Sequence, residues 1–321
     1  MLHPQARTLL NLIEQSGMPL THTLTPVQAR AYYRDRRTFT QPAPSEVGEV
    51  RDLSADGPHG PIPLRLYKPL AQKGAGTAAS SEKLPVLVYY HGGGYVIGDL
   101  DTHDVLCREL ANLSACAVVA VDYRMAPEHR FPVAVDDALA AARWVHKEAA
   151  NLGLDASRLA VGGDSAGGNL ATVVSILVRD SGDLPIAFQL LIYPGTDMRR
   201  VHPSHTTNGE GYLLTKDSIT YFLGHYIPDP QQALDWHASP LLHPDLSRLP
   251  PALILTAGYD PLRDEGLDYA RALTDAGNRA TYVCFEREIH GFITMGKVLD
   301  EANAAVALCA AELRRALYTQ R

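Results

Sequence analysis

Cysteines are few in this sequence, and long apolar runs are absent. The four cysteines among 321 residues lie far apart and form no C-x-x-C or Cys/His pattern typical of a metal site. This excludes a disulfide-scaffold protein and predicts a reducing compartment, so we predict a cytoplasmic location. No run of about 18 uncharged apolar residues exists, so we expect no membrane span. The first residues lack a cationic start followed by an apolar run, so we expect no signal peptide.

Positive charge is also scarce. Lys and Arg total 29 against 36 Asp and Glu, which gives a formal net charge of −7, and no basic block stands out. We therefore expect no nucleic-acid partner. Hydrophobic residues make up 46% and charged residues 20%, a composition typical of globular proteins that excludes a disordered or collagen-like chain.

The N-terminal region predicts two helices and then a β-hairpin. Thr25 followed by Pro26 is a typical helix start, because threonine caps the first turn and proline suits the first helical position. The predicted elements are helices over 4–15 and 26–36, hairpin strands over 47–53 and 62–67, and an exposed loop over 71–83.

From residue 85 onward, continuous apolar runs alternate with helical patterns. Runs that are apolar on both faces are typical of buried parallel strands, and strand–helix alternation predicts a mostly parallel sheet flanked by helices. The predicted strands are 85–90, 117–123, 158–164, 186–194, 252–260 and 280–286. The predicted helices are 103–113, 132–152, 166–180, 263–276 and 297–318. No strand is expected in 195–250, which we interpret mostly as an insertion over the sheet.

Residues 163–167, GDSAG, form the only G-x-S-x-G pattern in the chain. They lie between a predicted strand and a predicted helix. A strand-to-helix turn of this kind holds serine in a strained conformation that exposes its Oγ above the sheet. We therefore predict that Ser165 is a nucleophile; the alternative is a tight glycine turn with an incidental serine.

The segment HGGG, residues 91–94, directly follows a predicted strand. A serine attacking an ester creates a negative oxygen that needs preorganised N–H donors, and glycines let backbone amides approach it. We predict an oxyanion loop, with His91 bracing it rather than transferring protons. The alternatives are a flexible loop or a phosphate cradle, but the motifs of phosphate loops are missing.

A nucleophilic serine needs a base and a carboxylate that orients the base, here expected in the chain order Ser, acid, His. Asp260 ends a predicted strand, so its carboxylate would reach the carboxyl edge of the sheet. Asp264 is the competitor, which we expect to cap the following helix. His290 is the single histidine after Asp260 and is the predicted base; the alternative is a satisfied surface histidine.

Five segments together resemble the hormone-sensitive-lipase family of α/β-hydrolases, the bacterial family IV carboxylesterases. They are HGGGYVIGD (91–99), VDYRMAPEHRFP (121–132), GDSAGGNLA (163–171), DPLRDEG (260–266) and HGF (290–292). The resemblance covers the chain from about residue 45 to the end, and the N-terminal helices more loosely. It implies an α/β-hydrolase fold with a helical cap. Met125 stands where leucine is commoner, a mild packing change.

The resemblance also implies residue roles. The implied set is the triad Ser165, Asp260 and His290 with the oxyanion donors Gly93, Gly94 and Ala166. Arg124 and Glu128 are expected to form structural ion pairs. Tyr95, Tyr212 and Phe222 are candidates for substrate contacts. The aromatic residues of the insertion, Tyr212, Tyr221, Phe222 and Tyr226, equally fit a core of its own.

The expected organisation combines a catalytic core with a cap. The expected parts are a first cap segment over 1–45, core over 46–199, a cap insertion over 200–228 and core over 229–321. The histidines His202, His205, His225, His237 and His243 crowd one region but lack ligand spacing, so we expect no metal site.

We expect a serine carboxylesterase that hydrolyses short-acyl esters through an acyl-enzyme, without metal or organic cofactor. The partner is a small-molecule ester, and the resemblance implies a possible homodimer through the strand 280–286. An amidase, an arylformamidase or an acyltransferase with the same triad stays open. A non-catalytic ligand-binding α/β-hydrolase is the alternative from another class; such receptors in the family typically lack the histidine, which this chain keeps.

Overall fold

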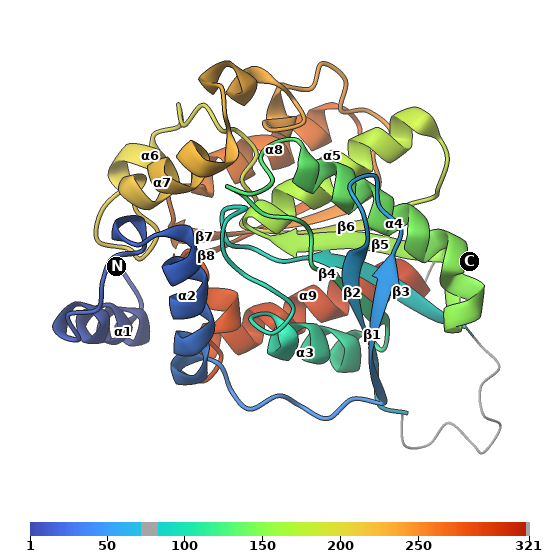
Figure 1. The fold of residues 1–321 in the computed structure, drawn as a ribbon, viewed down its shortest axis with the longest axis horizontal. Coiled ribbons are helices and arrows are strands. Elements are labelled where there is room, and N and C mark those ends of the chain that lie inside the picture. The colour runs from blue at the N-terminus through green and yellow to red at the C-terminus, as the bar shows by residue number, and fades with distance from the viewer. Residues whose placement is uncertain (72–82, 319–321) are drawn as a thin grey trace.

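The structure is a computed structural model that describes residues 1–71 and 83–318 (Figure 1). Most of the loop predicted over 71–83 therefore lies outside the described residues. Within the described ranges, the strands form one eight-stranded sheet with the order β1-β2-β4-β3-β5-β6-β7-β8. The strands are β1 (Glu49–Ala55), β2 (Ile62–Lys68), β3 (Leu84–Tyr90), β4 (Ala117–Val121), β5 (Leu154–Asp164), β6 (Phe188–Ile192), β7 (Ala252–Tyr259) and β8 (Ala280–Ile289).

Most neighbouring strands run parallel. β1 and β2 form an antiparallel hairpin, β2 pairs antiparallel with β4, and the remaining neighbours are parallel. The hairpin and the mostly parallel sheet predicted from the sequence are confirmed. β5 begins at Leu154, before the predicted start at 158, because Leu154 pairs with Leu84 across a register shift. Because polar residues follow Leu154, the apolar pattern of the sequence does not indicate this earlier start of the strand.

Nine helices are found among the described residues. They are α1 (Pro4–Gln15), α2 (Pro26–Thr40), α3 (Asp104–Ser114), α4 (Val133–Leu152), α5 (Ala166–Ser181), α6 (Ser204–Thr207), α7 (Lys216–Tyr226), α8 (Arg263–Asp275) and α9 (Asp300–Tyr318). Thr25 caps α2, and Gln28 closes a capping box with it. α2 runs beyond the predicted end at 36 because nothing breaks the helix before Pro42.

Helices cover both faces of the sheet, with α4, α5 and α8 on one side and α3 and α9 on the other (Figure 1). Successive side chains of a strand point to opposite faces. On β3, Val86 and Val88 pack in the core on the α4 and α5 side, whereas Leu87 and Tyr89 pack on the α3 and α9 side. All four side chains are fully buried, which explains the continuous apolar run in the sequence.

The interval 195–250 carries no strand, as predicted. It contains α6, α7 and two short 3-10 helices, Pro230–Leu234 and Pro240–Leu242. Tyr226 at the end of α7 is buried and stacks on Tyr95, with ring centroids 3.8 Å apart. This aromatic residue therefore belongs to the core.

Helix α2 is fastened to the loop that follows β3. Arg30 Nε donates to the Val96 carbonyl at 2.8 Å, and Arg30 also pairs with Glu128. Arg124 pairs with the buried Asp137. Arg124 and Glu128 thus form structural ion pairs as predicted, each with a partner that the sequence did not indicate. None of the helices in the described ranges combines the length and apolar character that crossing a membrane requires.

Candidate active site

Ser165 lies at the turn between β5 and α5. Its φ of 56° and ψ of −117° are unusual for a residue with a side chain, and such a conformation is strained. The turn is tight: a Cβ on Gly167 would collide with the carbonyl oxygen of Tyr90, so only glycine fits where α5 crosses β3. This is the local geometry that the G-x-S-x-G pattern predicted.

Ser165, His290 and Asp260 form one chain of hydrogen bonds. His290 Nε2 lies 2.9 Å from Ser165 Oγ, and His290 Nδ1 lies 2.7 Å from Asp260 Oδ2. Asp260 is fully buried, and its other oxygen accepts the Leu262 N–H at 2.8 Å. The structure therefore brings together the three side chains that the sequence selected, from the ends of β5, β7 and β8.

Asp264, the competing acid, has different contacts. Its carboxylate accepts the Ser204 N–H at 2.9 Å and pairs with Arg263. The expectation that Asp264 caps the following helix is wrong, because α8 begins at Arg263 with Leu262 at its cap position. Asp264 instead fastens α6 to the segment that carries Asp260.

The HGGG loop presents its glycines close to Ser165. Gly93 and Gly94 have φ values of 127° and 60°, and a Cβ on Gly94 would collide with the ring of Phe222. Within the described residues, the amide N–H groups of Gly93, Gly94 and Ala166 have no hydrogen-bond acceptor. Ala166 is also the first residue of α5, where the helix dipole favours negative charge. These amides are therefore free to bind an oxyanion.

Asp164 ties this loop to the serine turn, a role that the sequence analysis missed. Its carboxylate accepts the Gly92 N–H at 2.9 Å and the Tyr89 hydroxyl at 2.7 Å, and it faces His103. Burial raises the pKa of Asp164, but the charge and hydrogen bond of His103 and the Tyr89 hydroxyl outweigh it, so the pKa lies below its ordinary value. The carboxylate is therefore charged and holds the loop through Gly92.

His91 lies in the same buried frame. Its ring stacks on Tyr123 with centroids 4.4 Å apart, and its Nδ1 lies 2.8 Å from the Gly92 carbonyl. Burial and the neighbouring His103 lower the pKa of His91 to about 4. A neutral ring in this position fits a bracing role.

A cavity of about 1090 Å³ opens beside Ser165 and His290. The predicted substrate contacts Tyr95, Tyr212 and Phe222 all line it. Residues of α1, α2 and α7 complete its walls, so the N-terminal helices and the insertion border the same space as the triad. Tyr212 also packs on Tyr259, with ring centroids 4.9 Å apart.

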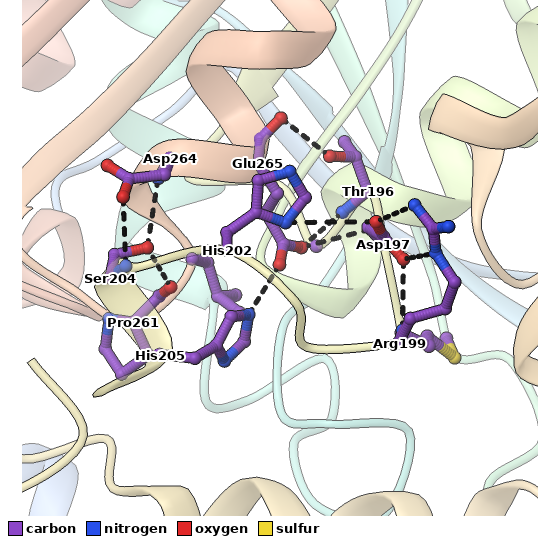
Figure 2. Close-up of polar contacts among 12 residues, drawn as sticks. Thr196, Asp197, Arg199, His202, Ser204, His205, Pro261, Asp264 and Glu265 are labelled. Atoms are coloured by element: carbon purple, nitrogen blue, oxygen red, sulfur yellow. Dashed lines mark hydrogen bonds and ion pairs between the residues drawn. The ribbon is translucent and has the colours of Figure 1, made fainter. Parts of the chain in front are cut away.

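Figure 2 shows a polar cluster centred on Glu265, and both Glu265 and His205 also line the cavity. Glu265 is buried and accepts the Thr196 N–H at 2.7 Å, while its other oxygen lies 2.7 Å from His205 Nε2. Burial raises the pKa of Glu265, and His205 lowers it in part. The cluster fixes the segment after β6 against α8. The sequence analysis did not predict this cluster; the acidic residues of DPLRDEG (260–266) were the feature that could have indicated it.

The crowded histidines do not converge on one point. His205 contacts Glu265, His202 lies near Asp268, and His237 contacts Asp235. In the part of the chain that the structure describes, no three or more His, Cys, Asp or Glu side chains are grouped so that they could hold a metal ion.

Comparisons with known proteins agree with this geometry. Residues 87–294 match the model of a family described as having the alpha/beta hydrolase fold. The chain is 43% identical over 293 residues to the carboxylesterase NlhH of Mycobacterium tuberculosis, covering 90% of this chain and 89% of that protein. It is 38% identical over 322 residues to an ethyl acetate hydrolase of Pseudomonas putida, covering 98% and 99%.

Two solved structures are similar over 98% of both chains. One is an ester hydrolase from the metagenome of Lake Arreo, complexed with a bipyridine phosphonate derivative, with a TM-score of 0.92 and 44% identity. The other is a hyperthermophilic esterase of Pyrobaculum calidifontis, with a TM-score of 0.89 and 41% identity. The chain belongs to the α/β-hydrolase family, in the hormone-sensitive-lipase group of carboxylesterases that its five sequence motifs resemble.

Proposed function

We propose that this protein is a serine carboxylic ester hydrolase that cleaves short-acyl esters through an acyl-enzyme. The observation that carries the proposal is the hydrogen-bond chain from Ser165 Oγ through His290 to Asp260, beside amide N–H groups that have no acceptor among the described residues. The names of the similar proteins, carboxylesterase and ethyl acetate hydrolase, support the same reaction class.

The first half of the reaction forms the acyl-enzyme. His290 Nε2 takes the Ser165 hydroxyl proton as Oγ attacks the ester carbonyl carbon. The carbonyl oxygen becomes an anion, which accepts hydrogen bonds from Gly93, Gly94 and Ala166 N–H groups. Asp260 keeps its hydrogen bond to Nδ1 and stabilises the charged imidazolium. The bond to the alcohol oxygen then breaks, and His290 gives the proton to the leaving alcohol.

The second half releases the acid. A water molecule loses its proton to His290 and attacks the acyl carbonyl, and the same amides hold the second oxyanion. The bond to Ser165 Oγ breaks, the serine regains its proton from His290, and the carboxylic acid leaves. An alcohol in place of water as the acyl acceptor would give the acyltransferase alternative. An amide or formamide substrate, with an amine leaving in place of the alcohol, would give the amidase and arylformamidase alternatives, and all of them use the same groups.

The helices that border the cavity fit the cap expected from the sequence. We propose that residues 1–45 and 200–228 exclude water from the triad and shape the acyl and alcohol pockets. Phe222 supports this role, because its ring lies directly against the position of Gly94.

A substrate panel tests the proposed function. p-Nitrophenyl esters from acetyl to decanoyl should give the highest kcat/KM among the short chains, and the matching anilides should react far more slowly. Equal rates for anilides and esters would favour an amidase, and acyl transfer to an added alcohol in excess of hydrolysis would favour an acyltransferase. Tight ligand binding without turnover would favour a receptor.

A further inference from the structure

The cavity that contains Ser165 extends to the N-terminal helices, where one wall is basic. Arg7 of α1 and Arg36 and Arg37 of α2 line the cavity together with the triad residues. The chain as a whole has a formal net charge of −7, so this wall does not follow from a basic composition.

In the part of the chain that the structure describes, Arg36 has aromatic neighbours but no acidic partner. Its guanidinium carbon lies 5.4 Å from the ring centroid of Tyr32 and 5.6 Å from that of Tyr33. In the described residues, its side chain makes no hydrogen bond or ion pair with a carboxylate. These ring contacts hold the guanidinium at the cavity wall and leave its N–H groups available for a bidentate acceptor.

Other arginines of the same helix are neutralised. Arg30 pairs with Glu128 and Arg34 pairs with Asp99, and both fasten α2 to the core. Arg36 has no such structural use, and it is half-buried at the cavity wall. The exposed carboxylates of Glu14 and Asp217 also line the cavity, so the cavity as a whole is not uniformly positive. An anion would therefore be bound only where its charge lies next to Arg36.

Tyr33 lines the cavity between α2 and the triad residues, next to Arg36. Burial raises the pKa of the Tyr33 hydroxyl, the charge of Asp164 raises it further, and the charge of Arg36 lowers it. Asp164 directly precedes Ser165, and Tyr33, Arg36 and Asp164 line the same cavity as this serine.

We propose that Arg36 forms an anion subsite and that the enzyme accepts esters carrying a carboxylate remote from the scissile bond. This inference rests on the proposed ester hydrolysis. A carboxylate offers two acceptor oxygens in the plane that a guanidinium fork matches. Because the contact is made to a carboxylate that takes no part in the reaction, it acts equally on substrate and transition state, so it lowers KM rather than raising kcat.

Two ester series test the subsite. Monomethyl esters of dicarboxylic acids of four to eight carbons place the charge on the acyl side, and acetoxyalkanoates place it on the alcohol side. Methyl alkanoates and alkyl acetates of equal length are their neutral counterparts. In Arg36→Gln the ratio of kcat/KM for charged over neutral esters should fall about tenfold at low salt in one series, mainly through KM. Arg36→Lys should retain part of the ratio.

Arg143→Gln is the matched control, because it removes one positive charge from an exposed ion pair on α4. It should leave the ratio unchanged. An unchanged ratio in Arg36→Gln for both series would overturn the subsite, while hydrolysis of the neutral esters would leave the proposed function standing.

If no neutral ester is hydrolysed, the proposed ester hydrolysis is contradicted, and rates can no longer test the anion subsite. Calorimetry with octanedioate, which needs no turnover, then tests the subsite by itself. Wild-type protein binding octanedioate about tenfold more tightly than Arg36→Gln at low salt would support the subsite. Equal binding by the two proteins would contradict it.

Discussion

Ser165 holds a backbone conformation that costs about 1–3 kcal/mol in an ordinary residue. Its N–H donates to the Ile192 carbonyl at 2.9 Å, and its own carbonyl accepts the Asn169 N–H at 3.0 Å. These bonds hold the turn from both sides, so the hydroxyl faces His290 without further rearrangement. The strain is thus stored where the proposed reaction needs a fixed nucleophile.

Glu288 is a second residue in an unfavourable environment, because its carboxyl group is buried. Its side chain is fully buried on β8, and neither carboxylate oxygen has a hydrogen-bond partner among the described residues. His3 Nδ1 lies 3.9 Å away. Burial and the charge of Glu301 together raise the pKa of Glu288 to about 7, although the Ile289 backbone and the charge of Arg287 lower it in part.

Glu288→Gln should stabilise the protein at pH 8 but not at pH 4.5. The folded pKa of about 7 lies above the ordinary value of 4.5, so the folded state binds the proton more tightly. Stability is therefore lost as pH rises through this window, by up to about 3 kcal/mol at 1.36 kcal/mol for each pKa unit. Urea unfolding at both pH values measures the difference between variant and wild type.

Glu286→Gln, at an exposed site on the same strand, is the control and should show no such pH dependence. If Glu288→Gln changed the free energy of unfolding by the same amount at both pH values, that result would contradict the raised pKa of Glu288.

At the scale of elements, α2 is fastened beside the HGGG loop through Arg30. Its bond to the Val96 carbonyl holds the residues that follow HGGG, and its bond to the Ala126 carbonyl holds the segment whose N–H donates to Tyr95. The helix start at Thr25 was predictable because capping is local in sequence. The contacts of Arg30 were not predictable, because they join segments 66 and 96 residues apart.

Arg30→Met should lower kcat about tenfold, because the loop that presents Gly93 and Gly94 loses an anchor. Arg51→Met, which breaks an ion pair on the edge strand β1, is the control and should leave kcat unchanged. The measurement is kcat at a temperature at which circular dichroism shows every variant folded. If Arg30→Met lowered only the melting temperature, α2 would contribute packing and not loop position.

At the scale of the whole molecule, the sheet and the triad were predictable for the same reason. Buried parallel strands are apolar on both faces, and their carboxyl ends collect residues that are far apart in sequence, here Ser165 and Asp260. Asp164 and Glu265 escaped prediction because their functions depend on contacts made only after folding. The cytoplasmic location and the homodimer through β8 stay predictions.

The most direct test of the proposed mechanism is to identify the acylated residue. Wild-type protein is mixed with p-nitrophenyl acetate, quenched in acid and mapped by peptide mass spectrometry, and kcat is compared with that of Ser165→Ala. We predict acetyl on Ser165 and a loss of kcat on the order of 10⁴–10⁶ in the variant. Ser54→Ala, at an exposed position on β1, should react as the wild type does. Acetyl on another residue, or Ser165→Ala turnover above about a tenth of wild type, would contradict the account.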